Sequence, residues 1–227
     1  MNYTNITRKK SSLAAFGIIF LVGFIVAISS TYAGPPAICH PVDIGNAKSI
    51  PWGDSAFDKK RGYSKSEVID DTVNILNNSH SALVHMETLR RATLYLDRNT
   101  KQATTLLAKL MAKTLDSETK QNANALAWFD AGYLAQCYDQ LGIDTDVICG
   151  KDQGVIGYAW IKKAIAINEN DAQLQFGAAM VTVLSGIKEH HEHSTRVKQL
   201  AKADSLVMKN LETHSKGIWT HAHGKGK

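Results

Sequence analysis

The sequence predicts an all-α fold built from antiparallel helix hairpins, and three observations lead to this class. From residue 64 onward, apolar residues recur every three or four positions, which is the period of a helix that buries one face. No stretch shows the convincing alternation of apolar and polar residues that a half-buried strand requires. The breaks between the periodic stretches are short, and short links favour antiparallel neighbours.

The apolar period divides the helical domain, residues 64–213, into seven expected helices. Their ranges are 64–76, 81–97, 101–115, 122–141, 154–168, 171–187 and 194–211. The first is expected to begin with a capping box, because Ser64 is followed three positions later by Glu67. The polar run at 77–79 should end this helix.

Each of the later helices is expected to turn a defined apolar face towards the core. The second presents Ala82, Met86, Leu89, Thr93 and Leu96, and the third presents Ala103, Leu106, Leu107 and Leu110. The sixth presents Phe176, Met180, Val183 and Leu184, and the seventh presents Val197, Leu200, Val207 and Leu211. The fourth, 122–141, is apolar on two faces, which predicts a helix sandwiched between neighbours.

Residues 1–33 have the three parts of a secretory signal peptide. Three basic residues at positions 8–10 precede an uncharged run of 16 residues, 13–28, and Ala33 offers a small residue for the cleaving peptidase. The alternative is an uncleaved anchor, since a bilayer span needs about 20 apolar residues. Cleavage predicts an exported protein, periplasmic or extracellular, with no membrane span in the mature chain.

The charge of the chain argues against nucleic acid as a partner. The sequence has 26 Lys and Arg against 21 Asp and Glu, and three of the basic residues lie in the signal, which leaves 23 against 21. Nucleic-acid binding calls for a concentrated basic face. A chain of this length suits one domain or a short repeat array.

Residues 34–63 are expected to form an ordered arm without regular secondary structure, docked on the helices. Its prolines, at positions 35, 36, 41 and 51, oppose a continuous helix or a central strand. The segment CHPVDIGNAKSIPWG at 39–53 is too rich in apolar residues for a solvated tail. At the other end, residues 214–227 are expected to be a flexible tail rich in His, Lys and Gly.

Two segments resemble the two helices of a tetratricopeptide repeat (TPR). ALAWFDAGYLAQCYDQLG, at 125–142, is similar to the first helix, with Trp128 and Gly132 four positions apart, and YAWIKKAIAINENDA, at 158–172, is similar to the second. Glu169 stands where the repeat usually has Pro, and DTDVICGKDQGVI is an insertion between the halves. The resemblance, over about 124–172, implies a TPR-like helical repeat bundle in which Gly132 lets the neighbouring helix approach closely.

The Cys-His-Pro segment near the start of the arm also resembles uncharacterised exported bacterial proteins that begin this way after their signal. This resemblance implies no activity. Cys39 next to His40 is a conceivable nucleophile and base, but no third orienting residue is visible in the sequence. A disulfide or a packed thiol is the favoured role for this cysteine.

Three cysteines in an exported chain allow one disulfide. We expect Cys137 to pair with Cys149, because the bond would tie the insertion to the helix before it. Closing a loop of about 13 residues would contribute roughly 3 kcal/mol. Cys39 is the alternative partner for either one.

Six of the nine histidines lie in the last 38 residues, and three of them, His190, His191 and His193, belong to the sequence KEHHEH. Imidazole is a common ligand for Zn, Cu and Ni, so this region is a candidate for weak metal binding. The alternative is a solvated helix junction. No resident cofactor is expected.

A polar group on the second expected helix is the candidate ligand site. Glu87, Arg90 and Arg91 lie within one helical turn of each other. They either form a solvated face stabilised by pairs three and four residues apart, or use the two guanidinium groups to anchor a carboxylate or phosphate.

No set of residues in the sequence forms a recognisable catalytic constellation. The favoured expectation is therefore an exported, non-enzymatic helical-repeat scaffold that binds a protein or peptide partner between its helix hairpins. The alternative is a periplasmic metal-binding protein that uses the His-rich C-terminal region.

Overall fold

The structure, a computed structural model, describes residues 36–215 and contains ten helices over that range. No β-strand occurs in this part of the chain, where a single isolated antiparallel bridge pairs Trp52 with Lys59. The predicted all-α class is confirmed. The predicted signal, 1–33, and the part of the predicted tail from residue 216 lie outside the described residues.

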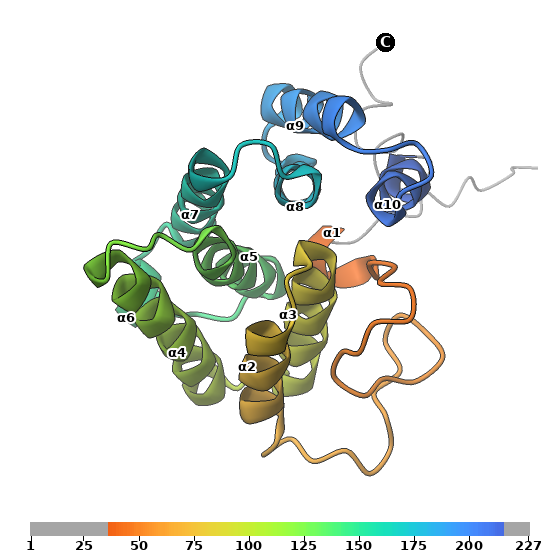
Figure 1. The fold of residues 1–227 in the computed structure, drawn as a ribbon. Coiled ribbons are helices and arrows are strands. Elements are labelled where there is room, and N and C mark those ends of the chain that lie inside the picture. The colour runs from red at the N-terminus through yellow and green to blue at the C-terminus, as the bar shows by residue number, and fades with distance from the viewer. Residues whose placement is uncertain (1–35, 216–227) are drawn as a thin grey trace, which may run out of the picture. The chain divides into compact units, whose positions relative to one another are not determined.

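Figure 1 shows how the helices are arranged along and around one another. They are α1 (Pro36–Cys39), α2 (Val68–Asn78), α3 (Ala82–Leu96), α4 (Thr100–Thr119), α5 (Ala125–Leu141), α6 (Asp146–Cys149), α7 (Gln153–Ile167), α8 (Ala172–Thr182), α9 (Ile187–Leu200) and α10 (Leu206–His214). Successive pairs, α2 with α3, α4 with α5, and α8 with α9, pack together, as the short links predicted. None of the helices in 36–215 combines the length and the apolar composition needed to cross a bilayer.

The centre of the domain is α5, which packs against α3, α4, α7 and α8. Every residue from Ala127 to Tyr138 is buried. The two-sided apolar pattern of this segment therefore predicted its sandwiched position correctly.

The contact between α5 and α7 depends on two glycines. A Cβ added to Gly132 would lie 2.6 Å from the carbonyl oxygen of Gly157, and a Cβ on Gly157 would lie 2.9 Å from the carbonyl oxygen of Gly132. Both contacts are with backbone atoms, which a side chain cannot displace cheaply. The close approach predicted for Gly132 is confirmed, and a repeat arrangement beyond this helix pair stays a prediction.

The single helix expected over 194–211 is wrong, because the structure has two helices there. The chain leaves α9 at Ala201 in an extended conformation, and the Ser205 side chain accepts a hydrogen bond from the backbone N–H of Met208 at the start of α10. Val197 and Val207 are both buried. The apolar pattern thus continues across the break between α9 and α10, and the Ser205 cap is the feature that marks the start of the second helix.

The helix expected over 171–187 ends five residues early, at Thr182. Asp171 caps its start by accepting hydrogen bonds from two backbone N–H groups. Phe176, Met180 and Val183 are buried as predicted, whereas Leu184, which follows the end of the helix, is 56% exposed.

The capping box predicted at the first helix is also wrong. Glu67 occupies the cap position of α2 with helical backbone angles and makes no side-chain cap. The hydroxyl of Ser64 bonds instead to the hydroxyl of Ser66.

The arm is docked on the helices, as its apolar content predicted. Ala37, Ile38, Val42 and Ile50 are buried, and the orange segment of Figure 1 runs beside α3. The arm differs from the prediction in one respect, since α1 is a single helical turn. Pro36 begins that turn, where proline is tolerated because the first N–H groups of a helix have no internal acceptor.

Candidate functional site

The predicted ligand-binding residues Glu87, Arg90 and Arg91 form a charged cluster between α3 and the arm, which we name the arm clamp. Arg90 is 0% exposed and Glu87 is 1% exposed, so a solvated face is wrong for both. Arg90 Nε lies 2.8 Å from Glu87 Oε2, and Arg91 Nε lies 2.7 Å from Glu87 Oε1.

Arg90 Nη2 donates a further hydrogen bond to Glu87 Oε1, and the Nη1 groups of both arginines bind backbone carbonyl groups of the arm. Arg90 Nη1 donates to Ile38 and Ala56, and Arg91 Nη1 donates to Ile50. The guanidinium groups predicted to hold a ligand therefore hold the chain's own N-terminal segment. Undocking the arm would leave these carbonyl groups and the buried Arg90 donors without their partners, which favours the docked arm.

A second contact between the arm and the helices pairs His40 with His214. Their ring centroids lie 6.0 Å apart in an edge-to-face arrangement, and both Nε2 atoms are buried without a hydrogen-bond partner in the described part of the chain. Burial, and then the nearby His40, lowers the pKa of His214 to about 4. His214, predicted to begin the flexible tail, is instead the buried last residue of α10.

The three histidines predicted to bind metal do not form a common site. His190 Nδ1 lies 2.9 Å from the carbonyl oxygen of Ala179, inside the core. His193 bonds to Gln175 and Tyr158 through its two ring nitrogens. Within residues 36–215, no group of three or more His, Cys, Asp or Glu side chains is placed to hold a metal ion.

The predicted Cys137–Cys149 disulfide is wrong, since both thiols are free. Cys137 contacts Thr93 of α3 from the buried face of α5, while Cys149 ends α6, which packs against α4 and α7. Burial raises the pKa of the Cys137 thiol well above its usual range. Cys39 is free as well, and burial raises its pKa, which opposes the thiolate that a nucleophile needs.

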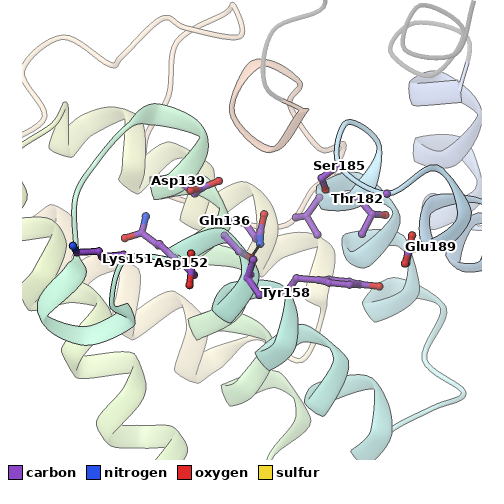
Figure 2. Close-up of a pocket in the computed structure, with 13 residues that line it drawn as sticks. Gln136, Asp139, Lys151, Asp152, Tyr158, Thr182, Ser185 and Glu189 are labelled. Atoms are coloured by element: carbon purple, nitrogen blue, oxygen red, sulfur yellow. Dashed lines mark hydrogen bonds between the residues drawn. The ribbon is translucent and has the colours of Figure 1, made fainter.

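The candidate site is a cleft of about 500 Å³ formed by the end of α5, the start of α7, the end of α8 and the start of α9. Figure 2 shows its lining. The lining residues are Gln136, Asp139, Lys151, Asp152, Gln153, Gly154, Val155, Tyr158, Val181, Thr182, Ser185, Gly186 and Glu189. We name it the α5–α9 cleft.

Glycines hold two of the carboxylates of the α5–α9 cleft close to the backbone. A Cβ on Gly154 would lie 2.7 Å from Asp139 Oδ2, and a Cβ on Gly186 would lie 2.6 Å from Glu189 Oε2. Any larger residue at either position would push the carboxylate away. The glycines therefore leave room for these carboxylates beside the backbone.

Tyr158 lies near the Glu189 carboxylate, on the α9 side of the cleft. Burial, followed by the charges of Glu189 and Glu192, raises the pKa of Tyr158 to about 12. Its hydroxyl lies 2.8 Å from His193 Nε2. At neutral pH this side chain is an uncharged hydroxyl held in place by a helix neighbour.

Three exposed apolar side chains, which we name the apolar border, either line the α5–α9 cleft or stand next to its lining residues in the chain. Val155, in its lining, is 70% exposed, and Leu184 and Ile187, on either side of the lining residues Ser185 and Gly186, are 56% and 62% exposed. Large apolar side chains gathered at the edge of a depression are typical of an interaction site.

A wider depression of about 690 Å³ lies between the arm and α2–α3. Its charged or titratable lining residues are Lys48 and His80, and the rest are apolar or neutral polar. It has no exposed large apolar residue in its lining. The α5–α9 cleft is therefore the stronger candidate.

Sequence reasoning missed this cleft, because its acidic residues are spread over 139–189 without a motif. The signal that bears on it is a pair of glycines at helix starts, Gly154 in the first turn of α7 and Gly186 at the cap of α9, each beside a carboxylate. Comparisons with protein-family models, with curated proteins and with solved structures found no match.

Proposed function

We propose that the protein is an exported helical scaffold that acts by binding a protein or peptide partner in the α5–α9 cleft. The observation that carries the proposal is the apolar border of the cleft, formed by Val155, Leu184 and Ile187. Burying such side chains on association is favourable by about 25 cal/mol per Å² before ordering costs are subtracted.

The frame around the cleft supports this role. The tight Gly132–Gly157 contact fixes α7 against α5, and α8 packs on α9, so the cleft lies between two firmly paired sets of helices. Helical-repeat proteins use the surfaces between hairpins in this way. Export rests on the signal pattern of residues 1–33.

The metal-handling alternative has less support. Two of the three predicted ligands, His190 and His193, place ring nitrogens on protein groups. A metal would have to displace those bonds, which lowers its affinity.

The test is a selection of random dodecapeptides on phage against the purified protein, followed by titration calorimetry of the selected peptides. Peptides that occupy the cleft should bind the Leu184→Ser/Ile187→Ser variant at least about tenfold more weakly, a loss of 1.4 kcal/mol. Leu115→Ser is the matched control, because Leu115 on α4 is 53% exposed and lies outside the cleft lining.

Two results would overturn the proposed function. One is a selection that yields no peptide whose binding is measurable. The other is a set of peptides that bind the double variant and the wild type alike.

A further inference from the structure

We infer that the partner of the α5–α9 cleft presents a Lys or Arg side chain flanked by apolar residues. This inference rests on the proposed function and adds the chemical class of the bound segment. It combines the apolar border with the charge of the lining.

The lining of the cleft has three carboxylates, on Asp139, Asp152 and Glu189, and one ammonium group, on Lys151. In Figure 2 Asp139 and Asp152 lie on one side of Gln136 and Tyr158, and Glu189 lies on the other. A bound group in the cleft would therefore meet negative charge from more than one wall. A cation is favoured there, and a carboxylate or phosphate is repelled.

These carboxylates are not used inside the described part of the chain. None of Asp139, Asp152 and Glu189 forms an ion pair with a Lys or Arg of residues 36–215, and none of their side-chain oxygens accepts a hydrogen bond there. Other acidic residues are paired, as Asp116 is with Lys120 and Glu118 is with Lys163. All three carboxylates in the cleft lining are therefore without an internal partner in the described part of the chain.

Two of the carboxylates lie directly against glycines of the cleft. Asp139 lies against Gly154 and Glu189 lies against Gly186, with no room for a Cβ on either glycine. A volume of about 500 Å³ accommodates one long basic side chain with parts of its neighbours.

The apolar border explains why a segment is a better occupant than a free amine. Val155, Leu184 and Ile187 offer contacts beyond the reach of a single ammonium or guanidinium group. Apolar residues on both sides of the basic residue would cover them. The occupant is therefore a stretch of polypeptide rather than a small cation.

The experiment uses the full mature chain and the peptides selected on phage. Lys or Arg should be enriched at one position of those peptides, and a synthetic peptide with norleucine at that position should bind at least about tenfold more weakly. In the Asp139→Asn/Glu189→Gln variant, this preference, the ratio of the affinities of the basic and the norleucine peptides, should fall to less than about twofold. Glu169→Gln, an exposed carboxylate outside the lining, is the matched control and should leave the preference intact.

Ionic strength supplies a second readout. Raising the salt concentration from about 0.05 M to 0.5 M should weaken binding of the basic peptide. Binding of the norleucine peptide should stay nearly unchanged, because screening acts on the charge pairs alone. Thermal unfolding of each variant checks that the exposed substitutions leave the fold intact.

The outcomes separate the two proposals. Selected peptides without a basic residue, or a Lys preference that survives in Asp139→Asn/Glu189→Gln, overturn the cation inference. If such peptides still lose affinity in Leu184→Ser/Ile187→Ser, the proposed function stands. If no peptide is selected, both proposals fail.

Discussion

At the residue scale, Gly132 illustrates how a missing side chain sets the distance between two helices. A Cβ at this position would meet the Gly157 carbonyl oxygen at 2.6 Å and the backbone nitrogen of Ile161 at 2.9 Å. Neither atom can move without shifting α7. Glycine is costly in a helix interior by about 1 kcal/mol, and the packing it permits offsets that cost.

Gly132→Leu should therefore lower the free energy of unfolding by about 2 kcal/mol or more, through overpacking. Ala166→Leu, on the exposed side of α7, is the control and should change stability by less than about 0.5 kcal/mol. Urea unfolding measures both. An unchanged midpoint for Gly132→Leu would show that the helices do not pack closely there.

His85 and Asp130 form a buried pair that makes stability depend on pH. Each side chain is 1% exposed, and His85 Nδ1 lies 2.6 Å from Asp130 Oδ1. His85 Nε2 lies 3.1 Å from the carbonyl oxygen of Ser79, so both ring nitrogens face acceptors, as an imidazolium requires. Burial lowers the pKa of His85, but the Asp130 carboxylate and the Ser79 carbonyl outweigh it, so the pKa is raised.

A raised pKa means that the folded protein binds this proton more tightly than the unfolded chain does. Its contribution to stability is complete below about pH 6.5, the ordinary histidine value, and is lost as the pH rises through the folded pKa. His85→Leu/Asp130→Leu should remove this alkaline fall in unfolding free energy. Urea unfolding from pH 6 to 8 tests it, and a wild type that is equally stable across that range would contradict it.

At the element scale, the arm depends on charges that belong to α3. Arg90 donates to Ile38 and Ala56 of the arm, and Glu87 accepts from the backbone N–H of Val42. Removing one member leaves a buried charge or a buried carbonyl without its partner. Such losses cost more than the same change on the surface.

Arg90→Met should lower the free energy of unfolding by about 3 kcal/mol and increase binding of an apolar dye, because the arm loosens from the core. Arg196→Met, which removes only exposed hydrogen bonds, should do neither. Deleting residues 34–53 gives the reference signal for full exposure. If the deletion variant has the wild-type melting point and binds no more dye than the wild type, then the arm does not cover apolar surface of the helices.

The His40–His214 contact should make the junction between the arm and α10 sensitive to acid. Burial, and then Arg90, lowers the pKa of His40, and burial lowers that of His214 to about 4. Because the unfolded chain binds these protons first, stability is complete above about pH 6.5 and falls as the pH drops towards 4.

Replacing the pair, as His40→Leu/His214→Phe, should reduce this acid loss between pH 6.5 and 4. Urea unfolding at several pH values measures the slope. His191→Phe, at an exposed position of α9, is the control and should keep the wild-type slope. Equal slopes in all three proteins would exclude the pair as its source.

At the scale of the whole molecule, the signal pattern predicts what part of the chain reaches its destination. Expressed in a bacterium, the protein should be recovered outside the cytoplasm with Gly34 as its first residue, since the small residue at Ala33 suits the cleaving peptidase. N-terminal sequencing and intact mass measure this. A membrane fraction that retains residues 1–33 would support the anchor instead.

Local patterns in the sequence were enough to predict the all-α class, the position of most helices and the docking of the arm. The helical apolar period reports which face of a segment is buried, as at Met86 and Leu106, and this property is local. The double apolar face of 122–141 even predicted its central place. The prediction of a single helix over 194–211 failed at 201–205, because the spacing of apolar residues does not indicate where a helix ends.

The roles of the polar residues depend on contacts between segments that are far apart in the chain, and these contacts are known only from the tertiary structure. Arg90 is separated by 52 residues from Ile38, whose carbonyl oxygen accepts its hydrogen bond. The residues within one turn of Arg90 on α3 do not predict that partner. The cysteines expected to pair, Cys137 and Cys149, lie on different helices, α5 and α6, and both thiols are free. The carboxylates Asp139 and Glu189 come together only when α5, α7, α8 and α9 pack. Long polar side chains take their function from segments far apart in the chain, and helical period cannot predict those contacts.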